Sequence, residues 1–376
     1  MMTLFAMAVA AAAFAYFGYP CSLILISLLR THTVRKASFF PRLTFLITVC
    51  NEEQRIRSKL ENTLALEYPR ELLQIMVASD GSTDSTNSIV REFGDRGVEL
   101  LEITERRGKE SAQKDAVAVA TGEVVVFSDV ATRIEPDALA KMMMNFADPT
   151  VGCVSSVDRV VGSDGKPCGE GAYVRYEMCL RELESRVSSL VGLSGSFFAA
   201  RREVCRDFSA DMQSDFRTVL NSMKLGLRGV SDPEVVGYYP DVATPSREFD
   251  RKVRTVLRGM TVFFRNVEFL NPVRYGLFAY QYVCHKLLRW MVPFFLLMAF
   301  LSCGIAAFQS PLARLFLLLQ VLFYGLALVG WMFPQVHHCI VVKIPLYFMT
   351  VNMAIAVAWW RYIRGARMVM WVPSQR

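Results

Sequence analysis

Three short apolar runs in the first part of the chain each lead into acidic side chains. Leu43 to Val49 is followed by Cys-Asn-Glu-Glu, Ile75 to Ala78 leads to Asp80, and Val124 to Phe127 leads to Asp129. Apolar runs of this length are typical of strands buried in a parallel sheet. Because the carboxyl ends of such strands share one edge, where open α/β folds hold ligands, the pattern predicts an acidic ligand site there.

Helix-like segments separate these runs at residues 52–66, 85–93 and 109–120. The pattern therefore repeats at roughly the length of a βαβ unit, which is about thirty residues. It predicts an α/β fold with a doubly wound sheet. For any single strand end, a capped turn between strand and helix is the structural alternative, because Ser, Thr and Asp commonly cap helices.

The composition is too apolar for an ordinary soluble domain, since 53% of the 376 residues are hydrophobic and 20% are charged. Residues 1–29 carry no charge, and a membrane span needs about 20 apolar residues. A secretory signal is the alternative, but the segment has no basic start and no convincing cleavage site. We therefore expect a retained transmembrane anchor.

Further uncharged runs follow near the other end, at residues 290–313, 315–342 and 344–360. They predict about three more spans. The expected organisation is one span over residues 1–30, a globular α/β domain over 41–248, an amphipathic helix over 249–270, spans within 276–364 and a tail over 365–376.

The basic residues next to the spans bear on orientation. Arg30, Arg35 and Lys36 follow the first span and favour a cytosolic globular domain. Arg361, Arg364 and Arg367 follow the last run and favour the same side for the carboxyl terminus. With four spans the two sides would differ, so either one apolar stretch is interfacial or re-entrant, or the charge rule fails here. We expect a multi-pass protein of the bacterial inner membrane, and the side of the carboxyl terminus stays open.

Six fragments, taken in order, resemble the membrane-bound members of glycosyltransferase family 2, which are related to the hyaluronan, chitin and cellulose synthases. They are VCNEE (49–53), SDGSTD (79–84), RRGKESAQKDAV (106–117), VFSDVATR (126–133), SDF (214–216) and EFDRKVR (248–254). The resemblance covers roughly residues 41 to 260. It implies a GT-A fold and inverting transfer of a sugar from a nucleotide diphosphate donor.

Sugar transfer of this kind must neutralise charge that grows on the diphosphate and must remove one proton from the acceptor. Asp129 matches the first aspartate of the family's DxD motif, which implies that it holds a divalent cation, Mg²⁺ or Mn²⁺. The third position of the motif is Ala131. A hard cation loses one oxygen ligand there and must replace it.

The resemblance implies that Asp215 is the general base, and the neighbouring Asp211 is its competitor. An N-cap of the following helix is the structural alternative for Asp215. Gly195 and Ser196 belong to the fragment VGLSGSFFAARR (191–202), which resembles the family's glycine-bearing segment that lines the donor sugar and the acceptor. Glycine allows the backbone to approach a sugar closely, and an ordinary loop is the alternative for this fragment.

Donor binding is expected from several further residues. The nucleoside end is assigned to Asn51, Glu52, Asp80 and Asp84. Lys109 lies at a predicted helix start, where a lysine adds to the helix dipole in holding phosphate. The resemblance implies that it binds the donor phosphate, and an ordinary solvated lysine is the alternative.

From Phe249 the apolar residues follow helical spacing, which predicts an amphipathic helix on the membrane. Its first turn overlays the family's QxxRW motif, with Arg251 at the glutamine, Arg254 at the arginine and Thr255 at the tryptophan. The resemblance implies that Arg251 and Arg254 bind the donor diphosphate, and binding of lipid headgroups is the alternative. The missing tryptophan argues against processive polymerisation.

The expected partners are a nucleotide-sugar donor, with UDP favoured, a lipid-linked or glycan acceptor, and membrane lipids. The product would be a cell-surface polysaccharide or a glycolipid. The basic residues form no dense patch with aromatic residues, so nucleic acid is not expected. A processive polysaccharide synthase, a polyprenyl-phosphate glycosyl synthase and a noncatalytic donor-binding subunit are the alternatives, and the oligomeric state stays open.

Overall fold

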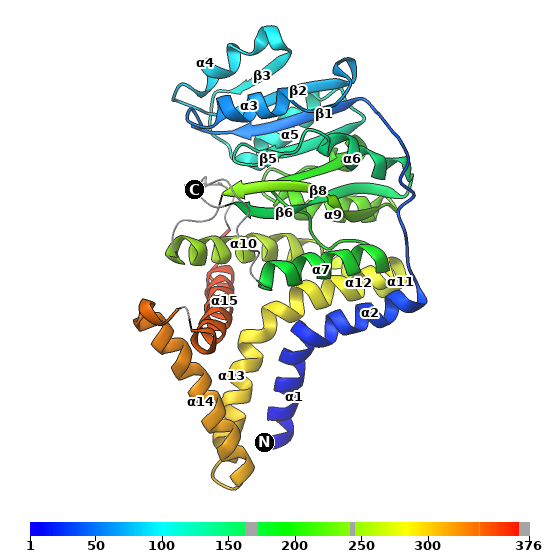
Figure 1. Cartoon of the computed structure of the whole chain (residues 1–376). Helices are drawn as coiled ribbons and strands as arrows, with labels where there is room; N and C mark the ends of the chain where they lie inside the picture. The colour runs from blue at the N-terminus through cyan, green and yellow to red at the C-terminus, as the bar shows by residue number, and fades with distance from the viewer. Residues whose placement is uncertain (162–171, 241–244, 338, 368–376) are drawn as a thin grey trace. The chain divides into compact units, whose positions relative to one another are not determined.

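The computed structural model describes residues 1–161, 172–240, 245–337 and 339–367. The chain forms two compact units (Figure 1). The sheet unit is Leu23–Ala243, and the helical unit is Met1–Ser22 together with Thr244–Arg367. Most of the tail expected at residues 365–376 lies outside the described residues.

The sheet unit contains a mixed sheet of eight strands in the order β3-β2-β1-β4-β7-β6-β8-β5. The first four strands of that order are parallel to their neighbours, and β7 runs antiparallel to both β4 and β6. The strands are β1 (Leu43–Val49), β2 (Leu73–Asp80), β3 (Val98–Ile103), β4 (Val124–Asp129), β5 (Arg133–Ile134), β6 (Val151–Val161), β7 (Phe197–Arg201) and β8 (Arg228–Pro240). The predicted α/β class with a mixed sheet is confirmed.

The register of the parallel strands brings the predicted acidic ends to one edge. Val49 of β1 lies opposite Ser79 of β2, and Thr48 lies opposite Asp129 of β4. All seven residues of β1 are buried, as expected for a central strand covered on both faces.

The helices of the sheet unit are shorter than the sequence pattern suggests. They are α3 (Ile56–Leu64), α4 (Thr86–Arg91), α5 (Lys109–Val119), α6 (Ala138–Met144), α7 (Ala172–Val187), α8 (Arg202–Cys205) and α9 (Ser214–Lys224). Helices were expected to start at 52 and 85, but α3 and α4 start later. The preceding residues have another role, because they join the loops after β1 and β2 by hydrogen bonds.

Four helices are long and apolar enough to cross a membrane, judged by length and composition. They are Met2–Leu29, Leu277–Ala306, Pro311–Met332 and Ile340–Ile363. The first comprises α1 (Met2–Ala13), a π-helical turn η1 (Phe14–Gly18) and α2 (Tyr19–Leu29), and the second comprises α12 (Leu277–Tyr282), a π-helical segment η6 (Val283–Leu288) and α13 (Arg289–Ala306). The others are α14 (Pro311–Met332) and α15 (Ile340–Ile363).

The second long helix does not follow the uncharged run at residues 290–313. It begins at Leu277, before Arg289, and ends at Ala306. Arg289 therefore lies within this candidate span and not at its boundary. The residue is 8% exposed, and its guanidinium lies 5.5 Å from the ring centre of Tyr16. The chain then turns, because Ser310 caps α14 and Pro311 occupies its first turn.

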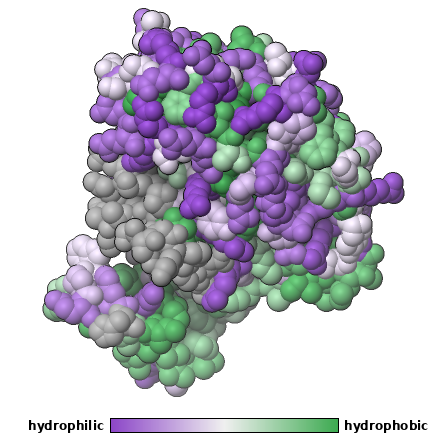
Figure 2. All heavy atoms as spheres, turned by 45° about the horizontal axis from the view of Figure 1, so that its top comes forward, coloured by the Kyte–Doolittle hydropathy of each residue, from purple (hydrophilic) through white to green (hydrophobic). Residues whose placement is uncertain are grey.

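Apolar side chains lie on the outside of these helices. Figure 2 shows apolar residues gathered at the lower end of the view and polar residues over most of the upper part. The exposed apolar side chains include Leu297, Leu301, Ile305, Leu318 and Leu322. Such a surface is typical of contact with a membrane or another protein.

The amphipathic helix is α10 (Pro245–Arg265). Its apolar residues Val253, Leu257, Met260 and Phe263 are fully buried. Phe263 stacks on Tyr282 with 4.4 Å between ring centres. The apolar face of α10 therefore packs on other helices, whereas the spacing predicted a face lying on lipid.

Candidate active site

The loops after β1 and β2 are joined by a set of hydrogen bonds. Asn51 has a positive φ of 54°, a conformation that asparagine tolerates better than most residues. Its Oδ1 accepts a 2.7 Å hydrogen bond from the backbone N–H of Thr83. The carboxylate of Asp84 accepts from the backbone N–H of Glu53 at 3.1 Å and of Thr86 at 3.0 Å. Asn51 and Asp84, both predicted to bind the nucleoside, thus also fix these two loops.

Glu52 lies in the first of these loops and is 8% exposed. Burial raises the pKa of its carboxyl group. The charge of Arg55 works to lower this pKa, and the charges of Asp129 and Asp84 work to raise it further. Glu52 is therefore close enough to Asp129 for the two charges to interact.

Asp80 orders the loop that leads into α5. Its Oδ1 accepts from the N–H of Arg107 at 2.8 Å, and its Oδ2 accepts from the N–H of Gly108 at 2.7 Å. Gly81 has a φ of +63°, and a Cβ atom on it would lie 2.7 Å from the backbone N of Arg106. Glycine is required at this position, and the close contact holds the start of α5 beside the end of β2.

Lys109 is the first residue of α5 and forms an ion pair with Asp129 at the end of β4. Its ammonium also lies 3.4 Å from the carbonyl oxygen of Gly195. Both side chains of the pair are largely covered, with 13% of Lys109 and 27% of Asp129 exposed. The predicted phosphate-binding lysine and the predicted metal ligand are therefore in direct contact.

The segment around Gly195 connects Asp129 to the predicted base. The N–H of Asp129 donates a 2.8 Å hydrogen bond to the carbonyl oxygen of Ser196. A Cβ atom on Gly195 would lie 2.9 Å from Oδ2 of Asp215. The structure therefore brings Lys109, Asp129, Gly195, Ser196 and Asp215 together.

Asp215 lies in the first turn of α9, but it is not the N-cap, which is Gln213. Its Oδ1 accepts a 2.8 Å hydrogen bond from the N–H of Phe216, and its Oδ2 accepts one from Gln213 at 3.2 Å. The role of general base stays a prediction.

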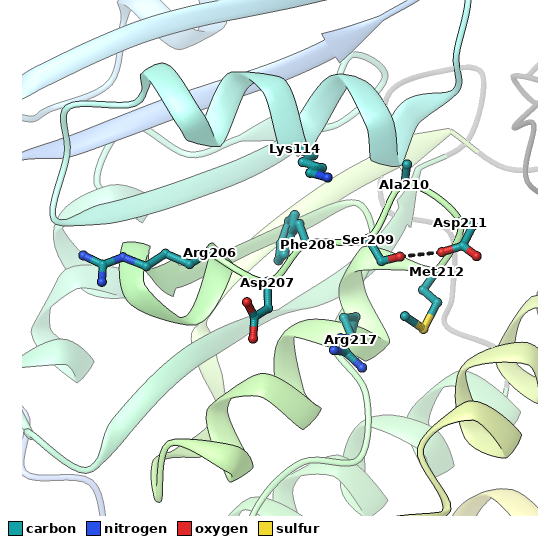
Figure 3. Close-up of a pocket in the computed structure, with 9 residues that line it drawn as sticks. All are labelled: Lys114, Arg206, Asp207, Phe208, Ser209, Ala210, Asp211, Met212 and Arg217. Carbon is teal, nitrogen blue, oxygen red and sulfur yellow. Dashed lines mark hydrogen bonds between the residues drawn. The ribbon is translucent and has the colours of Figure 1, made fainter.

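The competitor, Asp211, lies in a different place. It accepts a hydrogen bond from Ser209 and lines a cavity of about 600 Å³ (Figure 3). The cavity is bordered by Lys114, the segment Arg206–Met212 and Arg217, and Figure 3 shows Phe208 in its centre. None of the residues assigned to donor, metal or acceptor lines this cavity.

Asp158 belongs to the same region and was not expected from the sequence. Its Oδ1 accepts hydrogen bonds from the hydroxyls of Ser194 and Ser196, the second at 2.7 Å. The two serines flank Gly195, so Asp158 fixes the segment that contacts both Asp129 and Asp215. The available signal was an acidic residue inside the apolar strand β6, which gives no role by itself.

Arg251 and Arg254 belong to the helical unit. Arg251 makes a bidentate ion pair with Glu248, with N–O distances of 2.7 and 2.8 Å. Burial works to raise the pKa of Glu248, but Arg251 and Lys252 outweigh it and lower this pKa. Binding of the donor diphosphate by Arg251 and Arg254 stays a prediction.

The motif at this site offers a divalent cation one carboxylate, that of Asp129. Within the described residues, no three acidic, histidine or cysteine side chains gather closely enough to hold a metal ion. Asp129 is the expected ligand, and Ala131 cannot contribute an oxygen from its side chain. Mg²⁺ is commonly held by one or two carboxylates together with substrate phosphates and water, so the residues present fit such a site.

This chain resembles known proteins in sequence and in fold. Residues 44–208 match the family model described as Glycosyl transferase family 2, and Asp215 lies beyond the matched residues. The poly-beta-1,6-N-acetyl-D-glucosamine synthase of Staphylococcus epidermidis is 26% identical over 44% of this chain and 40% of its own length. The enzyme of the same name from Staphylococcus aureus (strain COL) is 27% identical over 50% of this chain and 46% of its own length. The chain thus spans less than half the length of these curated relatives.

A solved structure matches over almost the whole chain. It is a mannosyltransferase from Pyrobaculum calidifontis in complex with GDP-Man and Mn²⁺, with a TM-score of 0.74 and 25% identity. The match covers 97% of this chain and 100% of the other. That mannosyltransferase holds a nucleotide sugar and a divalent metal in its structure. Residues 44–208 therefore form a domain that matches glycosyltransferase family 2, within a sheet unit that has a GT-A-like mixed α/β fold.

Proposed function

We propose that the chain is a membrane-embedded inverting glycosyltransferase. It transfers a sugar from a nucleotide diphosphate donor, preferably UDP-linked, to a hydroxyl group of a lipid-linked or glycan acceptor. The observation that carries the proposal is the linked cluster of Lys109, Asp129, Gly195 and Asp215 at the carboxyl edge of the sheet. In this cluster Lys109 is the cation, Asp129 the metal ligand and Asp215 the candidate base, and Gly195 has no side chain to obstruct a sugar.

Each residue of this cluster has its own role in the proposed reaction. The acceptor oxygen attacks the anomeric carbon, and the bond from that carbon to the diphosphate breaks. Asp215 takes the proton of the acceptor hydroxyl, and the absence of a side chain on Gly195 leaves Oδ2 unobstructed on that side. Lys109 places positive charge where the nucleotide diphosphate leaves with the electron pair. A divalent cation at Asp129 supplies further positive charge when it is bound.

Membrane embedding is supported by the four apolar helices and by the exposed apolar side chains on them. The basic residues after the first helix favour a cytosolic sheet unit. We place the protein in the bacterial inner membrane, with the acceptor reaching the site from the lipid or from a growing glycan.

A GDP-linked donor is the second candidate. The mannosyltransferase that carries GDP-Man matches nearly the full chain, whereas the poly-N-acetylglucosamine synthases match about half of it. The donor is therefore tested with both nucleotides, using UDP-N-acetylglucosamine and GDP-mannose side by side.

The test uses the full chain purified in detergent with Mn²⁺, each donor and membrane lipid extract. We expect sugar transfer with release of nucleotide diphosphate. Asp215→Asn should abolish transfer and keep donor binding, whereas Asp211→Asn should keep both. If neither donor is bound or consumed, the proposed function is wrong.

The same assay separates the alternatives. Long products on a gel indicate a processive synthase. Transfer that tolerates Asp215→Asn indicates a polyprenyl-phosphate acceptor, which needs no base. Donor binding without turnover, measured by calorimetry, indicates a noncatalytic subunit.

A further inference from the structure

Lys59 is a buried lysine beneath the turn that carries Asp129. It lies on α3, and 3% of the residue is exposed. Its ammonium donates to the hydroxyl of Ser128 at 2.7 Å and to the carbonyl oxygen of Thr132 at 2.6 Å. It also lies 5.5 Å from the ring centre of Phe45.

The two acceptors stand at opposite ends of one turn. Ser128 lies in β4 directly before Asp129, and the turn from Asp129 to Thr132 closes with a 3.1 Å hydrogen bond from the N–H of Thr132 to the carbonyl oxygen of Asp129. One ammonium group therefore ties both ends of the turn to α3. No other described residue is bonded in this way to both Ser128 and Thr132.

Packing alone does not explain a lysine in this place. Taking an ammonium out of water costs several kcal/mol, and an apolar side chain of similar size is often neutral or stabilising at a buried charged site. The hydrogen bonds of Lys59 go to a hydroxyl and a carbonyl, which carry no full charge to compensate. A lysine at this place is better explained if it holds the turn in position than if it stabilises the core.

The DxD motif of this chain lacks its second carboxylate, so cation binding depends more strongly on the position of Asp129. With alanine at position 131, Asp129 is the acidic side chain of the motif that remains to hold a cation. A misplacement of about 1 Å at a site of this kind can lower a rate about 100-fold.

We propose that Lys59 is a positioning residue for the donor site, which sets the place of Asp129 by clamping Ser128 and Thr132. The proposal rests on the proposed function, because it assigns Asp129 to the donor diphosphate and its cation. Lys59 itself touches neither substrate nor metal.

The test compares Lys59→Met with the wild-type chain, both purified whole in detergent. Lys141→Met is the matched control, because Lys141 is a partly exposed lysine that pairs with Asp137 on α6. The first measurement is amide hydrogen exchange without ligands. We expect faster exchange at residues 129–132 in Lys59→Met and no change there in the control.

The second measurement is Mn²⁺ affinity in the presence of UDP, by calorimetry. We expect about a 10-fold loss in Lys59→Met, with an unfolding temperature equal to or above that of the wild type. Unchanged exchange at 129–132 together with unchanged Mn²⁺ affinity would overturn the proposal. A lower unfolding temperature with unchanged Mn²⁺ affinity would also overturn it, because it would show a purely structural lysine.

A second variant covers the case in which Lys59→Met does not fold. Ser128→Ala removes one of the two acceptors and keeps the lysine. It should give a smaller loss of Mn²⁺ affinity in the same direction, and no loss at all counts against the clamp. Sugar transfer is measured on the same samples: a wild-type chain that binds Mn²⁺ and UDP without transfer refutes the proposed function, while the exchange and affinity data still decide the role of Lys59.

Discussion

The carboxylate of Asp215 lies directly against Gly195, so that a Cβ atom at position 195 would come within 2.9 Å of Oδ2. Real Cβ atoms essentially never approach another atom this closely. One of the two residues must therefore shift if glycine is replaced. Gly195 and Asp215 are thus coupled, although Gly195 lies in the loop before β7 and Asp215 lies in α9.

Gly195→Ala should displace the carboxylate of Asp215 by a few tenths of an ångström or more. We expect kcat to fall about 10- to 100-fold because the base loses its position, with little change in the unfolding temperature. Steady-state kinetics on the full chain measure this. Gly94→Ala is the control, since nothing lies within 4 Å of a Cβ atom there, and equal activity of the two variants would contradict the coupling.

Lys109 and a divalent cation compete for Asp129. Without donor, the ammonium of Lys109 is paired with this carboxylate. Lys109→Gln should therefore tighten Mn²⁺ binding in the absence of donor and weaken binding of the donor diphosphate, whereas Asp129→Asn should weaken Mn²⁺ binding. Calorimetry of each variant measures both affinities. Weaker Mn²⁺ binding by Lys109→Gln would show that the lysine does not compete.

Asp158→Ala removes the acceptor shared by Ser194 and Ser196. Hydrogen bonds to a charged group contribute about 1.5–3 kcal/mol each, so the Gly195 segment should loosen. We expect the KM for the acceptor to rise about 10-fold or more, with a smaller effect on the KM for the donor. Asp95→Ala, on an exposed turn, is the control. An acceptor KM equal to that of the control would contradict a role for Asp158.

The buried Lys59 should make stability depend on pH. Burial lowers the pKa of Lys59 from 10.5 to about 7, although the charge of Asp129 works to raise it. Between these two values the unfolded chain binds a proton that the folded chain does not, so unfolding takes up a proton and stability rises with pH. The unfolding temperature of the wild type should rise over this window. In Lys59→Met the rise should be smaller, and an identical pH profile would show that Lys59 keeps an ordinary pKa.

The sequence was sufficient for the class of fold and for several members of the site. The strands at Leu43–Val49 and Val124–Asp129 follow from continuous apolar runs, because a central strand must be apolar on both faces. The family resemblance named Asp129, Lys109 and Asp215, since these residues occur in ordered motifs. Helix starts were less predictable, because residues such as Asp84 and Glu53 are equally suited to a helix or to a loop.

Only the tertiary structure decided which residues meet. Lys59 and Ser128, or Asp158 and Ser196, are far apart in the sequence, and no local pattern relates them. The sequence also did not predict what the apolar face of α10 contacts. Hydrophobic spacing shows that a face is buried, but it does not distinguish lipid from another helix. Local hydrophobic periodicity shows which face of an element is buried. The contacts within a site depend on which distant segments of the chain come together, and the packing of the fold determines this.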